Sequence, residues 1–283
     1  MKLKEIMDWF DRTAPLQLQE SYDNSGLIIG DKEQTVNRAV VCLDVDEAVL
    51  EYAVKKGADL VISHHPCVFR PIKTFISGSP EGSVLFSAIS RGIAVYSAHT
   101  NFDSAMGGLG DMICRELGLE EVRPVMPSNA AGPGHGLGRW GMYSNPIPFT
   151  GFLKALNGRL GIAAFREVGE RPEKVTRVTV LNGAYDKTFL DELLDIRPDV
   201  LLTGDLKYHD ALMLKHYGIY TMDAGHYQTE KIFVRGLSGM LESAFPNLKY
   251  CAGKARMFSG LFLPLTEYQA YIKIKCSKVN TDE

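Results

Sequence analysis

The sequence lacks the features of secreted, membrane-spanning and polynucleotide-binding proteins. Its five cysteines are scattered and include no C-x-x-C pair, so they predict neither a disulfide framework nor a thiolate zinc site. No apolar stretch approaches the roughly 18 residues of a membrane helix, and the start MKLKEIMDWF is too charged for a signal peptide. The net charge is −3, and the charged residues form no long run of one sign. We therefore expect a soluble cytoplasmic protein with no membrane or nucleic acid polymer as partner.

Short apolar runs alternate with segments of helical spacing along most of the chain. The runs are typical of buried parallel strands: Ala39–Leu43, Asp59–Ile62, Ile93–Ser97, Val178–Leu181, Val200–Leu202 and Ile219–Met222. The segments between them predict helices: Glu47–Lys56, Leu109–Leu117, Lys187–Leu194, Leu206–Tyr217 and Thr229–Leu241. With 45% hydrophobic residues over 283 positions, the chain can bury a substantial core. The alternation predicts an α/β fold, in which helices cover a sheet.

Two pairs of segments suggest an internal repeat, although the spacing between the matches differs. The segment from Gly57 to His65 (GADLVISHH) resembles the one from Arg197 to Asp205 (RPDVLLTGD), and GIAVYSAH from Gly92 resembles GIYTMDAG from Gly218. If the repeat is real, the chain forms two similar α/β lobes that face each other. Polar residues then end several strands at the side where open α/β sheets bind ligands, so we expect a cleft between the lobes.

A stretch rich in proline and glycine separates the two predicted lobes. Residues 123–148 contain five prolines, a composition typical of loops and linkers. A segment of helical character near Phe152–Leu156 is flanked by two strand-like segments, Leu137–Tyr143 and Ile162–Val168. Near the C-terminus, Tyr268–Lys275 alternates like an edge strand. We therefore predict an N-terminal lobe at residues 1–122, a connecting subdomain at 123–172, and a C-terminal lobe with a C-terminal extension at 173–283.

Two neighbouring histidines follow the predicted strand Asp59–Ile62. Adjacent side chains on a strand point to opposite faces, so His64 and His65 can share a site only where the strand ends. Pro66 fits this position, because it keeps His65 extended and cannot continue the strand. The pair could bind one metal ion each, and a solvated loop with two histidines is the alternative.

Two further segments add carboxylates and histidines after predicted strands. The first segment contains His99 and Asp103, and Asp103 is a candidate ligand. His99 could be a ligand, a proton donor to substrate or a buried histidine, and we favour a position for His99 behind the ligands. In the second, His226 and Glu230 are four residues apart, so on a helix they face the same way and can chelate a metal together. An ordinary surface hydrogen bond is the alternative for this pair.

Three histidines, one aspartate and one glutamate without a thiolate suit Zn, Fe or Mn better than Ca or Mg. Five protein ligands exceed the four of a closed tetrahedral zinc site. Two ions about 3.5 to 4 Å apart, bridged by a carboxylate and a water, accommodate all five ligands. The sequence therefore predicts a site for two divalent metal ions.

Polar residues also open the predicted helix Leu206–Tyr217. Asp205 could cap this helix, which is the commoner role for an aspartate at such a position. Together with Lys207 and His209 it could instead bind an anionic substrate. At the end of the first strand of the predicted sheet, Asp46 is expected to cap the following helix, and Asp44 is a reserve candidate for the site.

As an ordered set, five segments resemble the Nif-three-like (NGG-one interacting factor three) family, also called GTP cyclohydrolase I type 2 homologues. These segments are Tyr22–Asp31, Ser63–Pro66, Ala98–Asp103, Thr203–His209 and Gly225–Glu230. The resemblance implies two α/β lobes with a dinuclear metal site in the cleft between them, and a homohexamer built as a trimer of dimers. The implied metal ligands are the five chosen from spacing: His64, His65, Asp103, His226 and Glu230, with Glu230 bridging both ions.

The sequence departs from the family pattern at two places, and the first of them concerns the predicted substrate pocket. The turn after the first strand of the second lobe reads Asn182-Gly-Ala-Tyr-Asp, and Tyr22 stands where we expect tryptophan. The ligands predict a metal-dependent hydrolase that acts through a metal-bridging hydroxide. The resemblance implies that its substrate is a nucleotide or related phosphorylated small molecule. His99 and Glu230 are its candidate catalytic residues. The alternative is a metal-handling protein, such as an iron carrier or chaperone, or a protein-interaction protein, without turnover.

Overall fold

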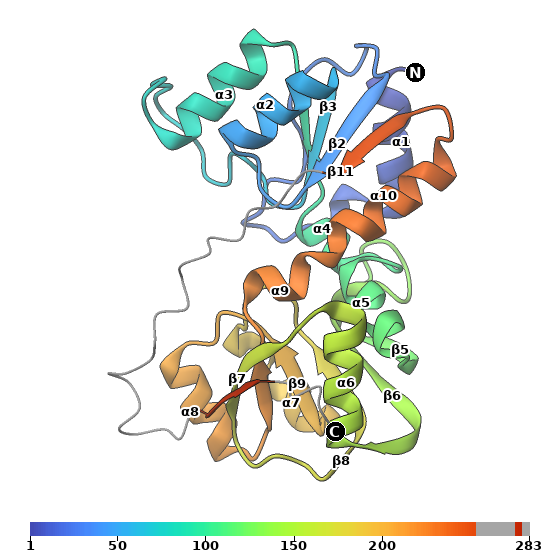
Figure 1. Ribbon diagram of the computed structural model, residues 1–283, viewed down its shortest axis with the longest axis vertical. Coiled ribbons are helices and arrows are strands. Elements are labelled where there is room, and N and C mark those ends of the chain that lie inside the picture. The colour runs from blue at the N-terminus through green and yellow to red at the C-terminus, as the bar shows by residue number, and fades with distance from the viewer. Residues whose placement is uncertain (253–274, 279–283) are drawn as a thin grey trace. The chain divides into compact units, whose positions relative to one another are not determined.

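The described chain, residues 1–252 and 275–278 of a computed structural model, divides into two compact units, each built on its own β-sheet (Figure 1). Unit 1 comprises residues 1–108, 130–132 and 233–252. Unit 2 comprises residues 109–129, 133–232 and 275–278. The mixed α/β fold predicted from the alternation of strands and helices is confirmed.

Unit 1 contains a five-stranded sheet in the order β1-β4-β3-β2-β11. Neighbours among β2, β3, β4 and β11 are parallel, and β1 runs antiparallel to β4. The strands are β1 (Gly26–Ile29), β2 (Arg38–Cys42), β3 (Leu60–Ser63), β4 (Ala94–Ser97) and β11 (Lys249–Ala252). The helices are α1 (Leu3–Thr13), η1 (Leu16–Leu18), α2 (Glu47–Lys56), α3 (Pro80–Ser90), α4 (Thr100–Ser104) and α10 (Ile232–Ala244).

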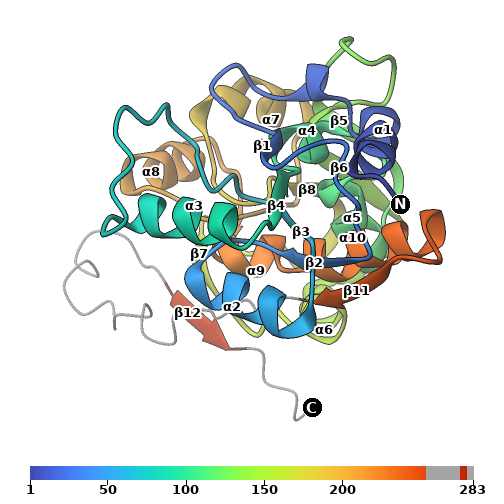
Figure 2. The same ribbon diagram turned by 90° about the horizontal axis from the view of Figure 1, so that it is seen from above.

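Helices cover both faces of the sheet in unit 1. Figure 2 shows α2 and α3 along one face and α1 and α10 along the other. On the second face, the ring of Phe10 from α1 stacks on Tyr96 of β4, with centroids 4.5 Å apart. Because both faces are covered, the strands are buried on both sides, which explains their continuous apolar sequences.

Helix α2 begins and ends where its sequence predicts. The Asp46 carboxylate accepts a hydrogen bond from the Val49 amide at 2.7 Å, so the predicted helix cap is confirmed. The helix ends at Gly57, which adopts the left-handed conformation (φ 62°) that favours glycine. Between these residues, Leu50 and Ala53 are fully buried.

Unit 2 contains a seven-stranded sheet in the order β12-β7-β10-β9-β8-β6-β5. Only β8, β9 and β10 are parallel, and the remaining pairs are antiparallel. The strands are β5 (Glu120–Pro127), β6 (Gly136–Pro148), β7 (Ala164–Val168), β8 (Lys174–Val180), β9 (Val200–Thr203), β10 (Thr221–Asp223) and β12 (Lys275–Lys278). The helices are α5 (Leu109–Leu117), α6 (Phe149–Leu160), η2 (Lys187–Phe189), α7 (Leu190–Ile196), α8 (Tyr208–His216) and α9 (His226–Glu230).

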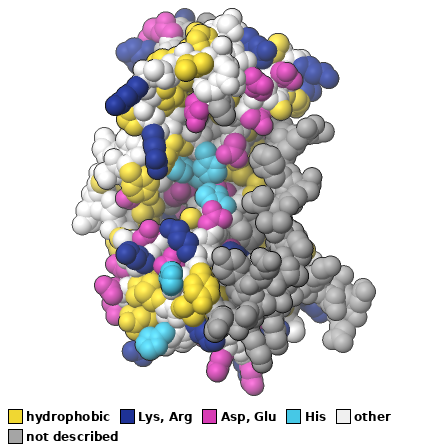
Figure 3. All heavy atoms as spheres, turned by 90° about the vertical axis from the view of Figure 1, so that its left-hand side faces the viewer, with side chains coloured by type: hydrophobic (Ala, Val, Ile, Leu, Met, Phe, Trp, Pro, Cys, Tyr) yellow, Lys and Arg dark blue, Asp and Glu magenta, His cyan; other side chains and the backbone are white. Residues whose placement is uncertain are grey.

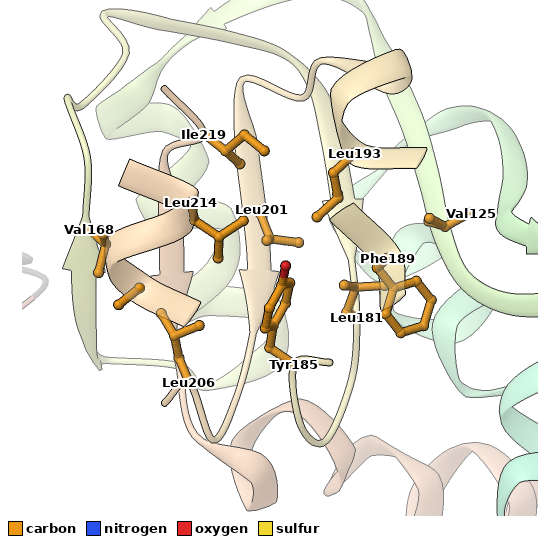
Figure 4. Close-up of a cluster of buried hydrophobic side chains, with 11 residues drawn as sticks. Val125, Val168, Leu181, Tyr185, Phe189, Leu193, Leu201, Leu206, Leu214 and Ile219 are labelled. Atoms are coloured by element: carbon orange, nitrogen blue, oxygen red, sulfur yellow. The ribbon is translucent and has the colours of Figure 1, made fainter. Parts of the chain in front are cut away.

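Apolar side chains from helices and strands form the core on one side of this sheet. Figure 4 shows Leu193 of α7 and Leu214 of α8 directed toward Leu201 of β9, with Tyr185 between the elements. These residues are almost completely buried. The core therefore holds β9 and the loops at its carboxyl end in place.

The repeat suggested by the sequence is present in the topology of the two units. Strands and helices follow one another as β2-α2-β3-α3-β4 and as β8-α7-β9-α8-β10, and each set places its strands in the same parallel order. In both, an antiparallel strand borders the third member, β1 next to β4 and β7 next to β10. Asp59 directly precedes β3 and Asp199 directly precedes β9. Each carboxylate accepts hydrogen bonds from two consecutive backbone N–H groups, so the two aspartates occupy equivalent places.

The division into compact units differs from the predicted boundaries at residues 122 and 172. Residues 123–172, predicted as a connecting subdomain, provide β6, α6 and β7, and β6 pairs with β8 while β7 pairs with β10. Strand β11 pairs with β2, so this C-terminal strand joins the N-terminal sheet. Local sequence does not specify such distant partners. The predicted edge strand Tyr268–Lys275 lies, except for Lys275, outside the described residues.

Within residues 1–252 and 275–278, no helix has both the length and the apolar composition that crossing a membrane requires.

Candidate metal-binding site

Three histidines of unit 1 lie at the carboxyl ends of two neighbouring parallel strands. His64 and His65 follow β3, and His99 follows β4. Their ring centroids are 5.0 Å (His64–His65), 5.2 Å (His64–His99) and 5.4 Å (His65–His99) apart. One ring nitrogen of each lies within 4.8 Å of the other two, so the three could hold a metal ion. His99, predicted to lie behind the ligands, is thus grouped with them.

Each of these histidines is hydrogen-bonded through Nδ1 to an oxygen. His64 Nδ1 lies 2.8 Å from the Ala98 carbonyl, and His65 Nδ1 lies 2.8 Å from the carboxylate of Asp44. Because a carbonyl only accepts, His64 carries its proton on Nδ1 when neutral, which leaves Nε2 as the nitrogen suited to a metal. Histidine ligands of metals are commonly oriented in this way.

Asp103 lies on the short helix α4, which begins directly after His99. Its Oδ1 is 3.7 Å from Nε2 of the fully buried His64, and its side chain is mostly buried. The structure therefore brings together two predicted ligands, an imidazole and a carboxylate, within unit 1.

Asp23 is a functional candidate that sequence reasoning missed. Its buried carboxylate lies 2.7 Å from His99 Nδ1 and accepts hydrogen bonds from the Thr100 amide and hydroxyl at 3.1 and 2.5 Å. Burial alone would raise the pKa of Asp23, but hydrogen bonds from His99, Thr100 and Ser25 outweigh it and hold this pKa well below its usual range. Asp23 therefore stays ionised and orients His99. The motif Tyr22–Asp31 contained the signal, but nothing in its spacing pointed to a residue 76 positions away.

In unit 2, His226 and Glu230 occupy the two ends of helix α9, directly after β10. His226 Nε2 lies 3.0 Å from Glu230 Oε2, as the spacing of four residues predicts for a shared face. His226 Nδ1 lies 2.8 Å from the carboxylate of Asp205. Glu230 is almost completely buried, so its carboxylate is held among other groups rather than hydrated.

Of the two roles considered for Asp205, the structure does not show the helix cap. Helix α8 begins at Tyr208, and no side chain caps it. Asp205 lies in the preceding turn with a positive φ of 44°, and its carboxylate contacts His226 instead. Lys207 and His209 are exposed at the start of α8, and their role in substrate binding stays a prediction.

A glycine turn packs closely against the pair on α9. A Cβ atom on Gly183 would lie 2.4 Å from Glu230 Oε1 and 3.3 Å from His226 Nε2, and the φ of +72° also disfavours any other residue. The Gly183 amide donates to Thr229 Oγ1 at 3.0 Å, which fixes the turn against α9. The unusual turn Asn182-Gly-Ala-Tyr-Asp therefore borders the predicted ligands. The nitrogen and oxygen donors of this pair fit Zn, Fe or Mn.

One buried carboxylate connects the two loops that carry Asp205 and His226. Asp223 accepts hydrogen bonds from the Gly225 amide at 3.0 Å and from the Leu206 amide at 3.3 Å, and it pairs with Arg166. Since Leu206 follows Asp205 and Gly225 precedes His226, this contact fixes both loops in place.

The candidate ligands are accessible from solvent to different degrees. His65 and His226 are partly exposed, whereas His64 and Glu230 are buried. Figure 3 shows histidine side chains at the surface, with acidic side chains among them. Small ions and molecules can therefore reach some of these groups.

Comparisons with known proteins identify the family. The model of the family Duf34/NIF3 (NGG1p interacting factor 3) matches residues 1–255. A GTP cyclohydrolase 1 type 2 homolog of Clostridium perfringens is 31% identical over 230 residues, 81% of this chain and 87% of that protein. The corresponding protein of a Nostoc species is 32% identical over 235 residues, 82% of this chain and 88% of that one.

Solved structures with the same fold include two that cover nearly the whole chain. A hypothetical protein of Staphylococcus aureus superposes with a TM-score of 0.82 at 26% identity, covering 90% of this chain and 97% of that one. Reduced HcgD from Methanocaldococcus jannaschii gives a TM-score of 0.78 at 28% identity, covering 90% and 98%. The chain therefore belongs to the Duf34/NIF3 family, which its sequence motifs resemble.

Proposed function

We propose that this protein binds two divalent metal ions, Fe, Zn or Mn, and uses them to hydrolyse a nucleotide or related phosphorylated small molecule. Its metal ligands are His64, His65, Asp103, His226 and Glu230. One observation carries the proposal: in each unit a histidine anchored at Nδ1 directs Nε2 toward a carboxylate, at 3.7 Å in unit 1 and 3.0 Å in unit 2. Two ligand atoms on one ion lie roughly 3 to 3.5 Å apart, because each bond is about 2.0 to 2.2 Å long.

The residues around these ligands would carry the remaining steps. When bound, such ions supply Lewis acidity and a nucleophilic water at neutral pH. His99, held at Nδ1 by the ionised Asp23, is placed to take or give a proton at Nε2. Lys207 and His209 would hold an anionic group of the substrate, and Asp205 would keep His226 oriented.

The names of the relatives support a nucleotide as the first substrate to test. Curated proteins about 30% identical to this chain are named GTP cyclohydrolase 1 type 2 homolog. For GTP, hydrolysis would open the imidazole ring of the base. Transfer of metal to an acceptor, without turnover, is the alternative function that the same ligands could serve.

Elemental analysis of anaerobically purified protein tests the metal-binding part. We expect about two equivalents of metal per chain, and a large loss in His64→Ala and in Glu230→Ala. His216→Ala is the matched control, because His216 lies at the far end of α8 and is exposed. Wild-type metal content in both ligand variants would show that these residues do not bind the ions.

Incubation of the metal-loaded protein with GTP and a panel of phosphorylated compounds tests turnover. We expect a hydrolysis product with the wild type and none with Glu230→Ala. If no compound is hydrolysed and the metal instead moves to an apo acceptor protein, the hydrolase proposal is wrong and the carrier function holds.

A further inference from the structure

Two exposed aromatic side chains lie beside the histidine cluster of unit 1. The ring centroids of Tyr22 and Phe69 are 6.2 Å apart, and the ring of Phe69 is 6.0 Å from that of His99. Tyr22 is 62% exposed and Phe69 is 41% exposed. Neighbouring large apolar side chains at the surface of a folded protein commonly mark binding sites.

Hydrogen bonds fix the two segments that carry these rings. Tyr22 directly precedes Asp23, whose buried carboxylate is held by His99 and Thr100. The Asn24 side chain donates to the Val68 carbonyl at 2.7 Å, so it ties the Tyr22 segment to the residue before Phe69. Both rings are therefore exposed on anchored backbone, and binding a ligand there requires little reordering.

The rings of Tyr22 and Phe69 meet at an angle. Their planes are tilted by 60°, so they do not stack on each other in parallel. A planar ligand can lie against the face of one ring and meet the other edge-on, and both arrangements are favourable at centroid distances of about 4.5 to 7 Å.

The geometry points to a subsite in which Tyr22 and Phe69 bind the planar heteroaromatic ring of the substrate, such as a nucleobase. This inference rests on the proposed function, because it places that ring next to His99 and the candidate metal ligands. Stacking on an aromatic side chain tolerates any base, since every base has a π-face. The subsite therefore selects for the presence of a ring rather than for guanine over adenine.

Calorimetric titration with GMP and with ribose 5-phosphate tests the subsite. We expect the wild type to bind GMP at least tenfold more tightly than ribose 5-phosphate, and to bind AMP about as well as GMP. Tyr22→Ala and Phe69→Ala should each weaken GMP binding roughly tenfold and leave ribose 5-phosphate binding unchanged. Tyr22→Phe should retain GMP binding, because it keeps the ring.

Tyr217→Ala is the matched control, since Tyr217 is a similarly exposed tyrosine (49%) in unit 2. Equal affinity for GMP and ribose 5-phosphate in the wild type, or wild-type GMP affinity in both alanine variants, would overturn the inference. Metal content is measured on the same samples. If the wild type binds no metal but Tyr22→Ala still weakens GMP binding, the result contradicts the proposed function and supports the aromatic subsite.

Discussion

The candidate histidine ligands depend on oxygen atoms that lie behind them. His65, His99 and His226 are each hydrogen-bonded at Nδ1 to an aspartate, and His64 to a backbone carbonyl. A carboxylate in this position fixes the tautomer and orientation of the ring and makes its other nitrogen more basic. Metal affinity is therefore expected to depend on residues that do not contact the metal.

Substitution of Gly183 tests whether the close approach of its turn to Glu230 matters for stability and metal binding. In Gly183→Ala the new Cβ would collide with Glu230 Oε1, and the positive φ would strain the turn. We expect a loss of about 1 to 3 kcal/mol in the free energy of unfolding and at least tenfold weaker metal binding. Chemical denaturation and metal titration measure the two effects.

Gly158→Ala is the matched control for this substitution. Gly158 lies within helix α6, and a Cβ there would meet nothing within 4 Å. Because alanine favours helix over glycine, this variant should gain up to about 1 kcal/mol and bind metal normally. Metal affinity in Gly183→Ala equal to that of Gly158→Ala would contradict the expected role of the turn.

Spacing along the chain predicted only part of the site. His226 and Glu230 are four residues apart on one helix, so their contact could be predicted. Asp23 and Asp205 could not be assigned their partners, because each reaches a histidine through a turn whose path depends on the folded structure. Asp205 also adopts a backbone conformation that is uncommon for aspartate, which no sequence pattern indicated.

At the level of secondary-structure elements, Asp223 links the ends of β9 and β10. Its carboxylate accepts from the amides of Leu206 and Gly225, one in each of the loops that follow these strands. The aspartate is buried and forms an ion pair with Arg166, an interaction in which hydrogen bonds are strong. The loops with Asp205 and His226 are thereby held at one separation.

Replacement of this carboxylate is expected to loosen both loops. Asp223→Asn keeps one acceptor oxygen, so one of the two amides loses its partner, at a cost of about 1 to 3 kcal/mol. We expect metal affinity to fall by roughly tenfold or more as well. Thermal unfolding and metal titration provide the readouts.

Asp199→Asn is the control for Asp223→Asn, because Asp199 directly precedes β9 and accepts hydrogen bonds from two backbone amides of β8. Both amides contact the same oxygen of Asp199, Oδ2, so this variant should lose at most as much stability as Asp223→Asn. It should keep normal metal affinity. A parallel loss of metal affinity in both variants would mean that general destabilisation, and not the position of the two loops, explains the effect.

The predicted elements agree with the structure best where both ends carry local signals. Helix α2 has an aspartate cap and a terminal glycine, and its bounds are as predicted. The predicted helix Thr229–Leu241 instead corresponds to two helices, α9 ending at Glu230 and α10 beginning at Ile232. Strand partners were not predictable for β6, β7 and β11, because pairing depends on contacts between distant segments.

For the molecule as a whole, exposed apolar side chains of unit 1 suggest contact with other chains. Four large ones, Phe75, Ile76, Phe86 and Ile89, lie on α3 and the loop before it and are 48 to 63% exposed. Large apolar side chains exposed on one short segment are costly in water and commonly form contacts between subunits. The family resemblance implies six chains, and this surface is where we expect part of the contact.

Light scattering after size-exclusion chromatography measures the assembly. We expect a mass near six times the 31.3 kDa of one chain. The double variant Phe86→Ser, Ile89→Ser should reduce this mass, because it removes apolar area from the contact. Leu212→Ser, at a 38% exposed position on α8 of unit 2, should leave it unchanged. A wild-type protein with the mass of one chain would contradict the expected hexamer.

The repeated topology provides each position near the candidate ligands with a counterpart in the other unit. His65 lies two residues after the end of β3, and Asp205 lies two residues after the end of β9, the equivalent strand. The first position carries an imidazole and the second a carboxylate. The same backbone pattern thus carries a proposed metal ligand in one copy and, in the other, an aspartate that orients a histidine. A substitution in one copy can change a residue of the proposed metal site while the other copy and its sheet stay intact. If the proposal holds, duplication gives this fold a simple means of adapting to another metal.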